Sequence, residues 1–365
     1  MTLIGYLART HFAEAAIEDA LPEEAGALTR ALVLIDDEPG AAAALKRVRD
    51  ALDGMTLTVV AVSASLPSHA TAARICAELA QHGGTALMAI GGAAAVGQAR
   101  LAADHAARQD RRPLVIAVPV SLFDLGLARQ IRPADGRPVP CGRPDCIIAD
   151  PSVLERTPPR RLAAAAMAVL VHAVEAYASP GFNPPADGLA LEAVRRMTGW
   201  LPTALGVKAG ARARAGADGR PAGPREARRE LMAAALTAGL AMEKTIGGVD
   251  ALARPMEAEL AGGHWPGEMR APLLAAVADF NAQAVGERYA ALARTFAGSE
   301  AEASFNRQIA GFAAAVGMPT RLRDVGIDPG RLDRFAEAAA NDPASLANPR
   351  RMTATDCRQI LEAAW

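Results

Sequence analysis

The sequence predicts an α/β domain built on a doubly wound parallel sheet, followed by an all-α domain. In the first part of the chain, short apolar segments alternate with segments of helical spacing, which is typical of a parallel sheet. After Asp150-Pro151 the strand-like segments stop and helical spacing continues almost to the end. A length of 365 residues suits two domains. We therefore divide the chain into residues 1–151, an α/β dinucleotide-binding-like domain, and residues 152–365, an all-helical domain.

The elements of the first domain follow from runs of apolar residues and from apolar spacing of three or four. The expected strands are Ala31–Ile35, Leu57–Val62, Ala86–Ile90, Leu114–Val120 and Cys146–Ile148. The expected helices between them are Ala41–Leu52, Ala72–Gln81 and Ala94–Gln109. Parallel neighbours need such crossover connections, because a tight turn joins only antiparallel strands.

The second domain is expected to consist of helices. They are Arg160–Tyr177, Ala186–Leu201, Glu226–Gly239, Ala271–Phe296, Ala301–Val316, Pro329–Ala340 and Thr355–Ala364. The first of these is rich in alanine and apolar, but it carries His172, and no apolar run reaches the roughly 18 to 20 residues of a membrane span. We expect it to be a buried core helix.

Composition and charge narrow the class of protein. The net charge is −1, which argues against nucleic-acid or membrane-surface partners, since both require a basic surface. Met1–Arg9 lacks the apolar segment of a signal peptide, so a cytoplasmic protein is expected. The four cysteines are predicted to be free thiols. Cys141 and Cys146 share a loop, but a zinc knuckle would need a second pair, which the sequence lacks.

A small-residue turn follows the strand at Ala86–Ile90. Gly91, Gly92, Ala93 and Ala94 open a helix, and such a turn lets backbone N–H groups approach a phosphate. Asp37, after the first strand, is placed to bind a ribose diol and to repel a 2′-phosphate. The alternative is a tight strand-to-helix turn, with the aspartate beginning a loop and capping the next helix.

Several motifs together resemble the iron-containing alcohol dehydrogenases, a family with a dehydroquinate synthase-like fold. They are Ile90–Arg100 (IGGAAAVGQAR), Ala117–Ser121 (AVPVS), Ile148–Leu154 (IADPSVL), His172–Tyr177 (HAVEAY), Val316–Gly326 (VGMPTRLRDVG) and Asn348–Trp365 (NPRRMTATDCRQILEAAW). The similarity runs along the whole chain, and Gly97 makes the maleylacetate reductase branch the nearest. The resemblance implies a nicotinamide cofactor, NAD(H) or NADP(H) with NAD(H) favoured, near Asp37, Gly91, Gly92, Ala93, Ala94 and Ser121.

The metal site of the family is altered in this sequence. The family has Asp and His four residues apart on one helix and then two further histidines; here the first position is Ala168 and only His172 remains on that helix. The family's H-x-L-x-H motif reads Asp250 to Arg254. Counted forward from Arg254, the last ligand falls on His264, but counted back from Phe280-Asn281 it falls on Pro266, and a two-residue insertion around His264–Pro266 would reconcile the two counts. We expect no metal, although His172, Asp250 and His264 would be acceptable ligands for Fe(II) or Zn(II).

The resemblance implies a metal-independent, NAD(P)H-dependent reductase of a small oxo acid or diacid, acting in the cleft between the domains. His172 would donate the proton, Arg254 would stabilise the developing charge or hold a substrate carboxylate, and Asp250 would orient them, with His264 as a further candidate. The alternatives are a hydrolase, lyase or isomerase that uses His172, Asp250 and Arg254, and a non-catalytic paralogue. The expected partners are a small carboxylate and a second copy of the chain.

Overall fold

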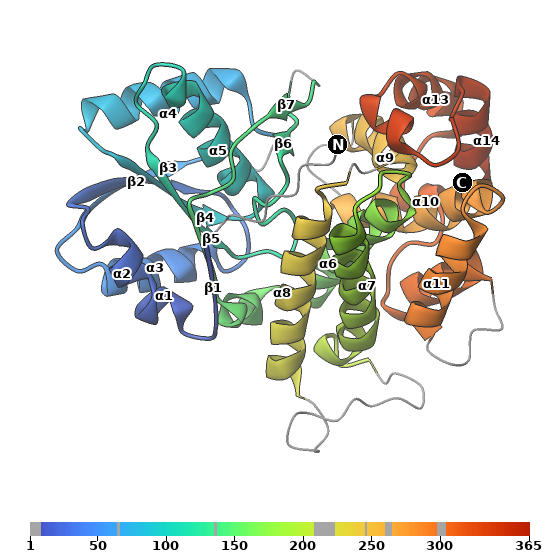
Figure 1. Cartoon of the computed structure of the whole chain (residues 1–365), viewed down its shortest axis with the longest axis horizontal. Coiled ribbons are helices and arrows are strands. Elements are labelled where there is room, and N and C mark those ends of the chain that lie inside the picture. The colour runs from blue at the N-terminus through green and yellow to red at the C-terminus, as the bar shows by residue number, and fades with distance from the viewer. Residues whose placement is uncertain are drawn as a thin grey trace. The chain divides into compact units, whose positions relative to one another are not determined.

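The computed structural model describes residues 9–63, 66–134, 137–207, 223–244, 247–259, 265–297 and 304–365. The chain forms two compact units, Gly5–Pro158 and Pro159–Trp365 (Figure 1). The first is an α/β unit with a six-stranded parallel sheet, and the second is helical. The predicted fold class is thus confirmed.

The sheet has the strand order β1-β8-β5-β4-β2-β3, and every neighbouring pair is parallel. Its strands are β1 (Arg9–Phe12), β2 (Arg30–Ile35), β3 (Thr56–Ala61), β4 (Ala86–Gly91), β5 (Leu114–Pro119) and β8 (Cys146–Ala149). All six residues of β4 are buried, as expected for a central parallel strand that is covered on both faces. The short strands β6 (Gln130–Ile131) and β7 (Val139–Pro140) form a separate antiparallel pair.

Helices cover both faces of this sheet (Figure 1). One face carries α1 (Ala16–Asp19), α2 (Leu21–Ala25) and α3 (Ala41–Ala51), and the other carries α4 (His69–Gln81) and α5 (Ala93–Ala107). The 3-10 helix η1 (Pro151–Arg156) follows β8. Because all strands are parallel, the carboxyl ends of β2, β4 and β5 meet at one edge, which is where ligands bind in open α/β sheets.

The second unit contains nine α-helices in its described residues. They are α6 (Pro159–Ala178), α7 (Pro184–Ala204), α8 (Pro224–Ala241), α9 (Gly248–Glu259), α10 (Pro266–Asn281), α11 (Gly286–Ala297), α12 (Phe305–Ala315), α13 (Leu332–Ala340) and α14 (Ala354–Ala364). The 3-10 helices η3 (Leu322–Val325), η4 (Pro329–Arg331) and η5 (Pro343–Ala347) lie between the later ones. Helices α6, α7 and α8 pack against one another, and α10 packs against α6.

Small residues bring α6 and α10 unusually close together. A Cβ atom built on Gly267 would lie 1.8 Å from the carbonyl oxygen of Ala164, so only glycine fits there. Among the described residues, α6 is the single helix long and apolar enough to cross a membrane by length and composition, and 83% of that window is buried inside the structure. This matches the expected buried core helix.

One predicted helix is wrong. The segment Ala271–Phe296 forms two helices, because α10 ends at Asn281 and α11 begins at Gly286. The side-chain amide of Asn281 is buried and donates to Asn348 Oδ1 at 2.8 Å, while Asn348 Nδ2 donates back to Asn281 Oδ1 at 2.8 Å. This reciprocal pair ties the last residue of α10 to the segment that precedes α14.

Candidate active site

The side chain of His172 comes from the middle of α6. Fifteen residues of α6 are buried, because the helix carries alanine and other apolar side chains on all of its faces. Ala168 lies one turn earlier on the same face and is fully buried, so the position that the resemblance assigns to the family's first ligand offers a methyl group. His172 is 7% exposed, and its Nε2 lies 3.9 Å from Oδ1 of Asp250.

Asp250 lies in the first turn of α9, where the helix dipole favours a carboxylate. It is 2% exposed. Arg270 donates from Nη2 to its Oδ1 at 2.7 Å, and Arg254, one turn later on α9, pairs with its Oδ2. Burial alone would raise the pKa of Asp250, but the guanidinium groups of Arg254 and Arg270 outweigh it and hold this pKa far below its usual range. We call His172, Asp250, Arg254 and Arg270 the Asp250 cluster.

Arg270 is a member that the sequence analysis missed. It lies on α10, is 4% exposed, and also pairs through Nη1 with the carboxylate of Glu257. Burial lowers the pKa of this guanidinium, but the carboxylates of Glu257 and Asp250 outweigh it, so the pKa is raised. The available signal was an arginine inside an otherwise apolar stretch (MRAPLLAAV), a position where a charge requires a buried partner.

Arg254 has the most exposed side chain of the Asp250 cluster. Its side chain is 22% exposed, and Nη1 donates to Oδ1 of Asp342 at 3.1 Å. Asp342 is held in turn, because its Oδ1 accepts from the N–H of Ala344 and caps η5. Arg254 is therefore anchored on two carboxylates and keeps one side toward solvent.

Glu175 lies one turn after His172 on α6 and is buried. Its Oε1 accepts from the N–H of Val249 at 2.7 Å, whereas Oε2 has no hydrogen-bond partner among the described residues. Burial and then the charge of Asp250 raise the pKa of Glu175 to about 8. The group is therefore a neutral acid at neutral pH, beside an ionised aspartate.

These residues do not fit the metal that the family resemblance implies. Ala168 offers no ligand atom, and both oxygens of Asp250 already face guanidinium groups. A divalent cation on Asp250 would lie within a few ångströms of two fixed positive charges, which repel it strongly in a buried site. Among the described residues, no group of three ligand atoms close enough to share an ion includes His172 or Asp250. His264 lies outside the described residues.

The aspartate that binds the backbone of the glycine turn between β4 and α5 is Asp36, whereas the sequence analysis singled out Asp37. Asp36 is buried, and its Oδ2 accepts from the N–H groups of Gly92 at 2.9 Å and Ala95 at 3.1 Å. A Cβ atom on Gly91 would lie 2.3 Å from Asp36 Oδ1, so glycine is needed at that position. Burial raises the pKa of Asp36, although the amides of Ala95 and Gly92 act against this.

The remaining predicted cofactor residues lie at the same edge of the sheet. Ala93 and Ala94 begin the 15-residue helix α5 and are half-buried; their N–H groups belong to its first turn, which has no intrahelical acceptor. Asp37 is exposed after β2. Ser121 is buried just after β5, and its Oγ accepts from the N–H of Phe123 at 3.4 Å.

Comparison with known proteins shows the family to which the chain belongs. A sequence model of the Fe-containing alcohol dehydrogenase family, C-terminal, matches residues 162–365, which is more than half of the chain. The chain belongs to the Fe-containing alcohol dehydrogenase family. It is therefore an oxidoreductase, from a family whose members are NAD(P)-dependent alcohol dehydrogenases and reductases.

Several individual proteins align with this chain over almost its whole length. The 4-hydroxybutyrate dehydrogenase of Cupriavidus necator is 28% identical over 394 aligned positions, which cover 99% of each chain. An alcohol dehydrogenase from Oenococcus oeni superimposes with a TM-score of 0.82 at 20% identity and covers 100% of each chain. Maleylacetate reductase from Agrobacterium tumefaciens gives 0.80 at 22% identity, covering 100% of this chain and 99% of its own. The fold is therefore shared with an alcohol dehydrogenase and with a maleylacetate reductase, and it does not distinguish between these two activities.

Proposed function

We propose that this member of the family is an NADH-dependent reductase of a small aldehyde or keto acid, working without a metal ion. The observation that carries the proposal is the Asp250 cluster, in which two guanidinium groups and a histidine meet at the family's metal position. Hydrogen-bond donors of fixed charge can stabilise an oxygen that becomes negative during reduction, which is the task a Lewis-acidic metal performs elsewhere.

The glycine turn offers the features that a dinucleotide needs. The N–H groups of Ala93 and Ala94, at the start of α5, would hold the pyrophosphate, where the helix dipole favours its charge. When bound, the reduced nicotinamide supplies the hydride. Asp37 is exposed, and the carboxylate of Glu38 lies 2.7 Å from the Cβ position of Gly92. Acidic groups at this edge suit ribose hydroxyls and repel a 2′-phosphate, so NADH is favoured over NADPH.

The Asp250 cluster divides the remaining work among its members. His172 gives a proton to the reduced oxygen, a role in which a positioned histidine typically contributes about 10²–10⁴-fold. Asp250 keeps His172 and both guanidinium groups in place from a buried position. Arg254 is the member with a solvent-facing side, and an arginine fork binds carboxylates well. We assign the substrate carboxylate to Arg254.

The names of two kinds of similar protein agree with an acidic substrate. A 4-hydroxybutyrate dehydrogenase aligns with the whole chain, and a maleylacetate reductase shares its fold. Both names refer to small carboxylates. The reduction of 4-oxobutanoate to 4-hydroxybutanoate is therefore the first reaction to test, and maleylacetate is the second.

The decisive experiment measures NADH oxidation by chelator-treated enzyme, with 4-oxobutanoate, maleylacetate and butanal as substrates. Butanal has the same aldehyde and chain length as 4-oxobutanoate but lacks the carboxylate. We expect turnover of at least one of the two acids without added metal, and a kcat/KM for butanal lower by roughly 100-fold, about the free energy of a charge-assisted hydrogen-bond pair.

Arg254→Met supplies the matched test of the carboxylate assignment. The variant should lose most of the activity on the acid and little of that on butanal, because only the acid uses the guanidinium fork. Activity that appears only after Fe(II) or Zn(II) is added would overturn metal independence. Calorimetric titration with NADH and NADPH separates a lost cofactor site, in which neither binds, from a wrong choice of substrate.

A further inference from the structure

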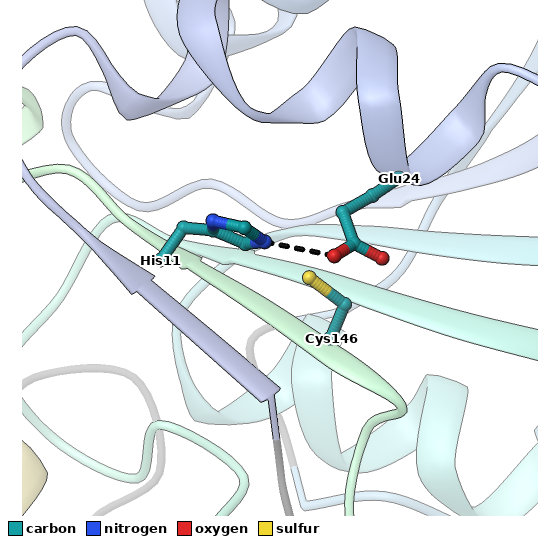
Figure 2. Close-up of side chains that lie close together, drawn as sticks. All are labelled: His11, Glu24 and Cys146. Atoms are coloured by element: carbon teal, nitrogen blue, oxygen red, sulfur yellow. Dashed lines mark hydrogen bonds and ion pairs between the residues drawn. The ribbon is translucent and has the colours of Figure 1, made fainter.

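Three residues capable of binding metal meet in the α/β unit, away from the Asp250 cluster. His11 is on β1, Glu24 is on α2 and Cys146 begins β8 (Figure 2). The parallel pairing of β1 with β8 places Arg9 opposite Cys146, and His11 is two residues further along the same strand. Side chains two residues apart share one face of a strand, and here His11 and Cys146 both lie toward Glu24 of α2 (Figure 2).

The ligand atoms of these residues are close enough to share one ion. Nε2 of His11, a carboxylate oxygen of Glu24 and Sγ of Cys146 all lie within 4.8 Å of one another. The closest pair, His11 Nε2 and Glu24 Oε1, is 2.8 Å apart and forms a hydrogen bond. Zinc bonds of about 2.0 Å to N and O and 2.3 Å to S require ligand atoms roughly 3.3–3.6 Å apart in a tetrahedron. Movements of about an ångström would therefore bring the three atoms into place.

The surroundings are also those of a metal site. Oε2 of Glu24 lies 3.1 Å from Nη2 of Arg9, which orients the carboxylate, while Oε1 faces the histidine and the thiol. Unlike the arginines on Asp250, Arg9 is a single guanidinium with a side-chain exposure of 64%, so solvent screens its charge from a bound cation. Cys146 is fully buried, Glu24 has a side-chain exposure of 9%, and His11 has one of 35%. Entry is therefore open beside His11, and a water molecule could serve as fourth ligand there.

We propose that His11, Glu24 and Cys146 form a binding site for a zinc-like divalent cation in the α/β unit. One imidazole, one carboxylate and one thiolate make up a donor set that suits Zn(II) and Co(II). On binding, the thiol of Cys146 loses its proton to solvent and the sulfur bonds to the metal; no redox change occurs. The ion would link α2 to β1, the terminal strand of the sheet, and to its neighbour β8.

This site differs in location and ligands from the family's metal position. None of its three residues lies on α6, α9 or α10, and all three belong to the unit Gly5–Pro158. Among the described residues, it is the one group of three His, Cys, Asp or Glu side chains whose ligand atoms are close enough to bind an ion. The chain is thus proposed to bind a structural cation near the sheet while its Asp250 cluster works without one.

Cobalt spectroscopy on the full-length, metal-stripped and reduced protein tests the proposal. Co(II) bound to a thiolate gives a near-ultraviolet charge-transfer band, and tetrahedral Co(II) gives intense visible bands. We expect both to saturate at one equivalent and to disappear when Zn(II) is added. Cys146→Ser should abolish the charge-transfer band, while His11→Ala and Glu24→Gln should weaken binding at least tenfold. His11→Ala is the variant most certain to fold, because this side chain is partly exposed.

Two controls separate this site from other thiols and from the family position. Cys357→Ser removes a buried thiol in the helical unit, and His172→Gln alters the Asp250 cluster; both should keep the spectrum unchanged. The proposal is overturned if millimolar Co(II) gives no charge-transfer band, if Cys146→Ser or His11→Ala binds as tightly as the parent, or if His172→Gln loses the spectrum.

Discussion

Arg270 donates from Nη2 to Oδ1 of Asp250 at 2.7 Å, and both side chains are almost completely buried. Buried ions are costly unless each has a partner, so the two charges depend on each other. Arg254 and Glu257 extend the pair on either side, and His172 lies next to it. A network of side chains thus fills a position where the family resemblance implies a metal ion.

Neutralising Asp250 should destabilise the helical unit strongly. In Asp250→Asn, Arg270 stays buried and loses one of its two carboxylates, so we expect a loss of about 3–5 kcal/mol in the free energy of unfolding. Urea unfolding measures it. Asp50→Asn, in an exposed i,i+4 pair with Lys46, is the matched control and should leave the midpoint unchanged. An equal loss of unfolding free energy in Asp250→Asn and Asp50→Asn would contradict the dependence of the buried Arg270 on Asp250.

His172→Gln should reduce turnover while leaving cofactor binding intact. We expect kcat to fall by about 10²–10⁴-fold because the proton donor is lost. The Kd of NADH, measured by calorimetry, should stay unchanged, because the glycine turn belongs to the other unit. His82→Gln, at an exposed position after α4, serves as control. An unchanged kcat in His172→Gln would remove this residue from the chemistry.

The buried acid at Glu175 predicts a specific dependence of stability on pH. Its pKa is raised to about 8 by burial and by Asp250, whereas an unfolded glutamate titrates near 4.3. Between these values the native state holds a proton that the unfolded chain releases. The contribution of Glu175 is therefore fully present below about pH 4 and is lost as pH rises through about 8, by at most about 1.4 kcal/mol per unit.

Glu175→Gln mimics the neutral acid and should flatten this dependence. Urea unfolding of the parent and the variant at about pH 5.5, 7 and 8.5 gives the comparison, and we expect the variant to gain relative stability as pH rises. Glu337→Gln, on the exposed face of α13, removes the same charge without burial and should follow the parent. Parallel curves for parent and Glu175→Gln would show that Glu175 is ionised in the native protein.

Asp37→Ala should weaken the preference for NADH over NADPH. The side chain is exposed after β2, at the edge of the sheet where the glycine turn begins. Removing one negative charge should lower the ratio of the Kd of NADPH to the Kd of NADH by about tenfold. This is the effect of one unit charge a few ångströms away in a solvated site. Asp53→Ala, another exposed aspartate, controls for net charge. If only Asp36→Asn changes the ratio, the ribose contact belongs to Asp36.

The strands of the sheet were predictable because burial on both faces makes them nearly continuous apolar runs. The run Ala86–Ile90 was predicted as a strand, and β4 covers Ala86–Gly91 with every residue buried. By contrast, β1 (RTHF) was not predicted, because it is short, polar and largely exposed. Its position depends on pairing with β8, which is more than 130 residues away in sequence.

The candidate sites were predictable only where they are local. Asp250 and Arg254 are one turn apart on one helix, so their pairing follows from helical spacing. Arg270 reaches them from α10, and Asp342 from the start of η5, through tertiary packing that the spacing does not contain. Likewise, Cys146 was predicted to be a free thiol, and nothing in its loop pointed to His11 or Glu24.

The two guanidinium groups on Asp250 also limit the order in which the site can change during evolution. Asp250→His alone would take a carboxylate from the buried Arg270 and leave this guanidinium with one carboxylate partner, Glu257. Ala168→Asp alone would force a second carboxylate into the fully buried α6, close to Asp250 and the neutral Glu175. Each of these two substitutions toward the family's ligand set is therefore expected to cost stability. While both arginines are in place, the cluster therefore disfavours a change to the family's ligand set through either of these single substitutions.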